Sequence, residues 1–90
     1  MSKAVVDPNE LRRFAADLKK FNGDVQTHMG KLGASLGNLQ QTWRDQEQAK
    51  FAEEFEEMIR SLQRFMKTSE VFVPFLVRKA ERIEDYLNQR

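Results

Sequence analysis

Few residues of this 90-residue chain could do chemistry: it has one histidine, His28, four glutamates around Phe55 at 53–57, and no cysteine. His28 falls between Val25 and Leu32 on an apolar stripe. A histidine there is either a boundary or core residue with one hydrogen bond or a pH-sensitive contact at a helix interface. Carboxylate-bridged metal sites in helical bundles use Glu-x-x-His pairs, and the glutamates here have no histidine near them. We therefore predict no metal site, no cofactor and no catalytic residue.

The sequence also lacks the motifs of common enzyme classes. Glycine-rich phosphate loops, Ser-His-Asp sets and thiolate ligands are missing. The basic pairs at 12–13 and 19–20 are interleaved with Asp17 and Asp24, and 15 basic residues nearly balance 14 acidic ones. A net charge of +1 does not favour nucleic acid or an anionic membrane as a partner. We expect a non-enzymatic protein that acts by protein–protein interaction.

The N-terminal residues do not resemble a cleavable signal peptide, because they contain no long apolar stretch. The longest apolar run, 71–77, is far shorter than the roughly 20 residues that a membrane-spanning helix needs. We expect a chain that is cytoplasmic as made and does not insert into membranes. Any export would use a route without a cleaved signal peptide.

The first half of the chain predicts one helix over about residues 8–40. Asp7 can cap it, Pro8 suits its first position, and Glu10 completes a capping box. Apolar residues then recur at spacings of three or four, which is typical of an amphipathic helix. One row repeats every seven residues, while a companion row drifts; the rows are Leu11, Leu18, Val25, Leu32 and Leu39, and Phe14, Phe21, Met29, Leu36 and Trp43.

The second half predicts another helix, over about residues 46–88, with Asp45 as its cap and Gln48 in the reciprocal position. Its apolar face is wide, which suggests contact with more than one neighbour. Pro74 interrupts the apolar run and removes a backbone donor, so the helix either kinks or breaks there. The helical spacing resumes in register after Pro74, which favours a kinked continuous helix.

The two helices predict an all-α, single-domain fold over 1–90: an antiparallel two-helix hairpin with a turn at about 41–45. The second helix is the longer, so its last residues should extend past the first helix without intramolecular cover. Such exposed apolar surface usually marks an interaction site, and we predict a homo- or heterodimer that forms a four-helix bundle. The candidate interface residues are Phe14, Phe21, Phe65, Phe72, Val73, Leu76, Ile83, Tyr86 and Leu87.

Gly30, Gly33 and Gly37 lie at helical spacing beside the apolar stripe. Each costs about 1 kcal/mol relative to alanine in a helix interior. Either they form a smooth surface that another backbone can approach closely, or they make this part of the helix soft and mobile. Both interpretations stay open from the sequence.

Trp43 is the only tryptophan and stands in the turn, where it can fold back as an apolar plug or contact a ligand directly. A leucine-rich first helix, this Trp43 and an opening second-helix turn with Ala49, Phe51 and Phe55 resemble the WXG family, the small Esx-type helical hairpins of type VII secretion. The resemblance covers about residues 11–86. It implies antiparallel dimers that are secreted substrates or carriers for larger toxins, recognised by a membrane-bound secretion ATPase.

The chain departs from the family pattern at two places. Asp45 stands where the motif has glycine, giving Trp-Arg-Asp, although aspartate can still cap the second helix. The family's C-terminal secretion signal pairs a tyrosine with an acidic residue four positions later, and Tyr86 is followed at that distance by Arg90. Two alternatives remain: an intracellular adaptor or chaperone that is not exported, and a subunit of a helical filament.

Overall fold

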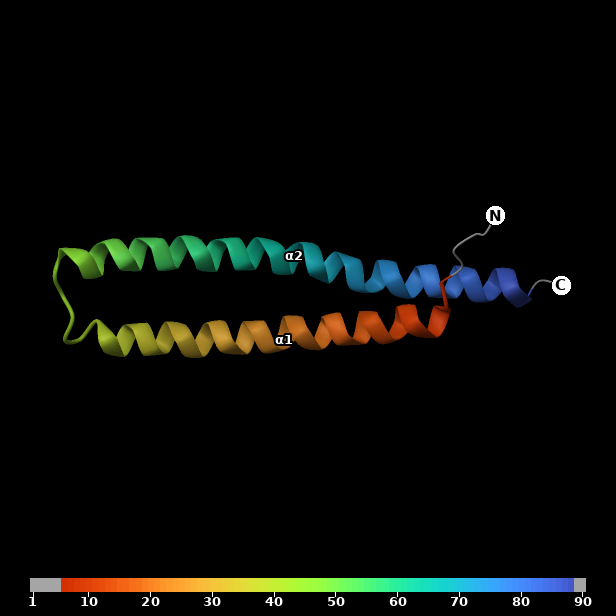
Figure 1. The fold of residues 1–90 in the computed structure, drawn as a ribbon, viewed down its shortest axis with the longest axis horizontal. Helices are drawn as coiled ribbons and strands as arrows, with labels where there is room; N and C mark the ends of the chain where they lie inside the picture. Colours follow the sequence, from red (N-terminus) through yellow and green to blue (C-terminus); the bar gives the residue numbers. More distant parts are fainter. Residues whose placement is uncertain (1–5, 89–90) are drawn as a thin grey trace.

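The computed structural model describes residues 6–88, which form two long helices and a short turn (Figure 1). Helix α1 spans Pro8–Leu39 and helix α2 spans Gln46–Asn88. They lie antiparallel, and the first residue of α1 and the last residue of α2 are at the same end of the molecule (Figure 1). The fold is therefore the all-α two-helix hairpin that the apolar spacing predicts, about 69 Å long.

Each helix begins directly after an aspartate that caps it. The Asp7 carboxylate accepts a hydrogen bond from the Asn9 amide at 2.9 Å, and the Asp45 carboxylate accepts one from the Gln48 amide at 2.9 Å. These bonds satisfy amide groups that have no partner within the first turn of a helix. At the other end of α1, the Trp43 amide donates to the Leu39 carbonyl at 2.9 Å and closes the turn.

The seam between the helices contains small and polar residues at its most buried positions. Ala15 and Ala80 are 2% and 0% exposed, and Met66 is 5% exposed. Asn22 and Ser69 are also buried, and the Ser69 hydroxyl donates to the Asn22 Oδ1 at 2.9 Å. Half-buried apolar residues flank them; they are Leu11, Leu18, Val25, Met29 and Leu36 of α1, and Ala52, Phe55, Ile59, Leu62, Val73, Leu76, Val77 and Ile83 of α2.

The open end of the hairpin is held by an ion pair between helices. The Arg12 Nη1 lies 2.5 Å from the Glu84 Oε2. The last turns of α2 extend beyond the start of α1, as its greater length predicts (Figure 1). Ile83 nevertheless is half-buried, which differs from the expectation that this residue has no intramolecular cover. Glu84 follows Ile83 in the sequence, and its contact with Arg12 shows that long side chains of α1 reach this part of α2.

Pro74 lies inside α2, which continues on both sides of it. The break that the sequence left open at Pro74 is therefore not formed. The kink that a proline imposes by removing one backbone hydrogen bond stays a prediction.

Candidate protein-interaction site

One face of the hairpin carries a row of large exposed apolar side chains from both helices. We define the aromatic face as Phe14 and Phe21 of α1 with Phe51, Met58, Phe65 and Phe72 of α2, all between 43% and 58% exposed. The rings of Phe21 and Phe65 meet edge to face, with centroids 6.4 Å apart, which places the two rows side by side. The face is therefore continuous across the hairpin.

The α2 row of the aromatic face repeats at seven-residue steps, at 51, 58, 65 and 72. A straight α-helix drifts by about 20° per seven residues, so a strict repeat is typical of helices that wind around a partner. The residues of α2 that face α1 follow a different row, one position further along the chain, at 52, 59, 66, 73 and 80. Two adjacent rows thus give α2 two contact surfaces, one used within the chain and one exposed.

The candidate interface residues separate into three groups. Phe14, Phe21, Phe65 and Phe72 lie on the aromatic face and are exposed. Val73, Leu76 and Ile83 are half-buried, and Val73 belongs to the row that faces α1. Near the end of α2, Tyr86 is 75% exposed and Leu87 is 46% exposed. The structure therefore brings only the four phenylalanines together on one continuous surface.

Phe51 and Met58 belong to this surface although they were not among the candidate interface residues. The signal that finds them is the seven-residue step, which includes them with Phe65 and Phe72. Phe51 also contacts the turn: its ring centroid lies 5.9 Å from that of Trp43 and 6.2 Å from that of Phe55. Trp43 is half-buried and packs against the first turns of α2, as an apolar plug would.

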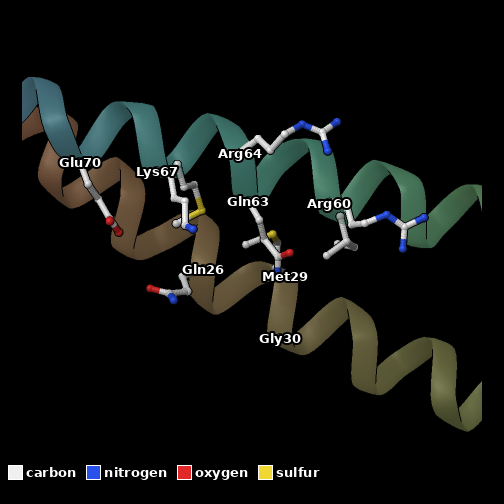
Figure 2. Close-up of a pocket in the computed structure, with 10 residues that line it drawn as sticks. Gln26, Met29, Gly30, Arg60, Gln63, Arg64, Lys67 and Glu70 are labelled. Carbon is white, nitrogen blue, oxygen red and sulfur yellow. The ribbon is translucent and has the colours of Figure 1, made fainter.

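The opposite face of the hairpin has a shallow groove between the helices, with a volume of about 700 Å³ (Figure 2). Met29, Ile59 and Met66 supply its apolar lining. Figure 2 shows Gln26 and Gly30 on the α1 side and a series of long charged side chains on the α2 side. The α2 side is formed by Arg60, Gln63, Arg64, Lys67 and Glu70.

Gly30, Gly33 and Gly37 have no close neighbour within the chain. A Cβ atom added at any of them would meet nothing within 4 Å. None of the described glycines has a positive φ angle, so the backbone does not require glycine at these positions either. Their proposed role in close packing thus concerns only a surface open to another molecule.

Surface ion pairs shift the pKa values of two carboxyl groups. A hydrogen bond from Arg60 to Glu57 at 2.6 Å, with the positive charge of Arg60, lowers the pKa of Glu57 below its ordinary value. Lys20 lowers the pKa of Asp24 in the same way, at 2.9 Å. Each pair lies within a single helix, Lys20 with Asp24 in α1 and Arg60 with Glu57 in α2. Each stabilises its helix only modestly because the side chains are exposed.

The described part of the chain contains no group of His, Asp or Glu side chains placed to hold a metal ion. Between residues 6 and 88, no helix is long and apolar enough to cross a membrane. Buried polar side-chain atoms in this range all have hydrogen-bond partners. Three surface features of the described residues remain to be interpreted: the aromatic face, the groove and the end of α2.

Two long antiparallel helices, a tryptophan in the connecting turn and an exposed aromatic face define a small helical hairpin protein. The chain belongs to the WXG100 family, described as proteins of 100 residues with WXG, which it matches over residues 4–86. This membership places it among the Esx-type proteins related to type VII secretion, as the resemblance around Trp43 predicted.

Solved structures support the same assignment. The chain is similar to the crystal structure of EsxB, a secreted protein of Bacillus anthracis str. Sterne, with a TM-score of 0.79 and 27% identity, covering 98% of this chain and 100% of that one. A single-residue mutant of EsxB gives a TM-score of 0.84 at 27% identity, covering 96% of this chain and 100% of that one. A search of curated proteins found no match.

Proposed function

We propose that this protein is a small secreted protein of a type VII system that works as a dimer of hairpins joined through their aromatic faces. The observation that carries the proposal is the continuous aromatic face with Phe21 and Phe65 at its centre. Large aromatic side chains this exposed are unfavourable in water, and a matching surface on a second hairpin would cover them. The result is a four-helix bundle.

The large surface area of the single hairpin supports a second hairpin as its partner. Its accessible surface is 7279 Å², whereas a compact monomer of 10.6 kDa exposes about 5,500 Å². Its radius of gyration is 20.2 Å, against about 12 Å for a compact chain of this length. A stable interface removes about 800 Å² from each partner, so one such contact would cover only part of the excess.

The finer role that we propose is that of a secreted substrate or of a carrier for a larger partner such as a toxin, delivered to a membrane-bound secretion ATPase. Support comes from family membership and from the end of α2, where Tyr86 is the most exposed large apolar residue of the described chain. The family signal also needs an acidic residue at position 90, where this chain has Arg90, which lies outside the described residues. A heterodimer with a similar hairpin that carries the acidic residue would supply that signal.

The dimer is tested by placing charges on the aromatic face. The double variant Phe21→Glu with Phe65→Glu should run as a monomer in multi-angle light scattering, whereas the unmodified chain runs as a dimer with itself or with a co-expressed hairpin. Four buried carboxylates in one interface cost far more than the lost apolar contact. Both residues are about half exposed in the single hairpin, so the helical circular dichroism spectrum should persist.

A matched control introduces the same number of charges elsewhere. Thr27→Glu with Val71→Glu changes exposed residues outside the aromatic face, since Val71 points about 100° around α2 from Phe72. This control should remain dimeric. A monomeric unmodified protein at all concentrations, alone and with hairpins encoded beside it, would contradict the dimer.

The second candidate is an intracellular adaptor or chaperone that is not exported. The departure from the family's secretion signal at position 90 favours it. Immunoblotting of culture medium from cells with and without the secretion ATPase separates the two roles. Export that depends on the ATPase supports the secreted protein, and retention together with a specific larger partner supports the adaptor.

A further inference from the structure

The groove and the aromatic face lie on opposite sides of the hairpin. Around α2, Phe65 of the aromatic face lies about 100° to one side of the buried Met66, whereas Gln63 and Lys67 of the groove both lie on its other side. A dimer formed through the aromatic face would leave the groove open to solvent. The groove is therefore available for another partner and goes beyond the proposed dimer.

The two walls of the groove differ in charge and in size. The α2 wall carries Arg60, Arg64 and Lys67 against two acids, Glu56 near Gly33 and Glu70 at the other end. Arg60 forms an ion pair with Glu57 at 2.6 Å, whereas Arg64 donates a hydrogen bond to the neutral Ser61 hydroxyl at 3.1 Å. The α1 wall has no charged lining residue, because Gln26, Gly30 and Gly33 form it. A guest would thus meet cations on one side only.

The α1 wall also has no side chains at two of its positions, Gly30 and Gly33. A Cβ atom at Gly30 or Gly33 would have open space around it, so the backbone of α1 is accessible there. Small residues on one helix let a second helix approach closely, because no side chain keeps the backbones apart. Met29, Ile59 and Met66 then offer apolar and adaptable side chains to the underside of the guest.

We propose that the groove binds an amphipathic helix of another protein whose apolar ridge is flanked on one side by carboxylates. The ridge would lie over Met29 and Ile59, and the carboxylates would face Arg64 and Lys67. A second copy of this chain does not fit this description. Its acidic stretch at 53–57 surrounds Phe55, and Phe55 is already half-buried within its own hairpin.

Two designed peptides test the proposal with the full chain. Each is a helix of about 18 residues with leucines at helical spacing, long enough to be ordered on binding. One carries glutamates along a single flank and the other carries lysines at the same positions. In fluorescence anisotropy at low salt, the acidic peptide should bind and the basic peptide should not, and added salt should weaken binding.

Two pairs of substitutions locate the binding site. Arg64→Glu with Lys67→Glu should weaken binding at least about tenfold, because two attractions become repulsions. Gly30→Leu with Gly33→Leu should do the same by filling the α1 wall. The control Arg13→Glu with Lys50→Glu makes the same change in net charge at exposed residues outside the groove. It should lose only a small, salt-sensitive part of the affinity.

The readouts keep this proposal separate from the dimer. Phe21→Glu with Phe65→Glu should still bind the acidic peptide, and the groove variants should keep the oligomeric mass of the unmodified protein. Equal binding of both peptides, or acidic-peptide binding that survives the groove substitutions, would overturn the proposal. So would sedimentation of the protein with phosphatidylserine vesicles when it does not bind the acidic peptide.

Discussion

Asn22 and Ser69 form a polar contact in the middle of an otherwise apolar seam. They are 6% and 2% exposed, and the hydroxyl of Ser69 donates to the amide oxygen of Asn22. Apolar residues in a helical hairpin tolerate sliding by one heptad, because leucine meets leucine again after the shift. A buried polar pair does not, since each partner would lose its hydrogen bond in a new register.

This contact predicts coupled effects of substitution. Asn22→Ala should lower the free energy of unfolding by about 1–3 kcal/mol, because it leaves the Ser69 hydroxyl buried without an acceptor. The double variant Asn22→Ala with Ser69→Ala should cost less than the sum of the two single variants. Urea denaturation followed by circular dichroism measures all three. Strictly additive losses would show that the two side chains do not depend on each other.

At the scale of the element, α1 is a helix with an unfavourable stretch near its C-terminal end. Gly30, Gly33 and Gly37 each cost conformational entropy on folding, and a Cβ atom added at any of them would meet nothing within 4 Å. This stretch is consequently less stable than the rest of α1. It lies opposite the middle and first turns of α2, next to the groove.

Alanine should therefore stabilise α1 at these positions. Gly30→Ala is expected to raise the free energy of unfolding by about 1 kcal/mol, because alanine has the higher helix propensity and its Cβ atom has space. Thermal denaturation of the single variant and of the variants at 33 and 37 tests this, with Ala34→Gly as the reverse control. A loss of stability would mean that the glycine backbone itself is needed within the hairpin.

The elements could be predicted from the sequence because their signals are local. Asp7 with Pro8, and Asp45 with Gln48, mark helix starts by chemistry confined to one turn. The role of each apolar row could not be predicted in the same way. The rows at 65 and 66 in α2 are both apolar, and only the position of α1 decides that Met66 is buried while Phe65 stays exposed.

For the same reason, the candidate interface mixed two kinds of residue. Val73 is as apolar as Phe72, yet Val73 faces α1 and Phe72 lies on the aromatic face. Neighbouring residues on a helix differ by about 100°, so one step along the chain separates an internal contact from an external one. The groove could not be predicted from the sequence because it forms only where the two helices lie side by side.

For the whole molecule, the interior of the single hairpin is small. Three apolar residues of the described chain are buried, and two of them are alanines. In the proposed dimer, the second hairpin would supply much of the apolar burial, and the stability would then depend on protein concentration. We expect the melting temperature to rise as the concentration of the chain, or of its partner hairpin, is raised. A melting temperature independent of concentration would assign the stability to the single hairpin.

The location of both helix ends at one end of the hairpin has a mechanical consequence (Figure 1). A force that draws on the end of α2 acts at the open end, where Arg12 and Glu84 hold the helices together. The contacts along the seam are then broken one after another, as in a zipper, rather than all at once in shear. A hairpin held in this way opens under a smaller force than one whose helices are pulled apart in shear.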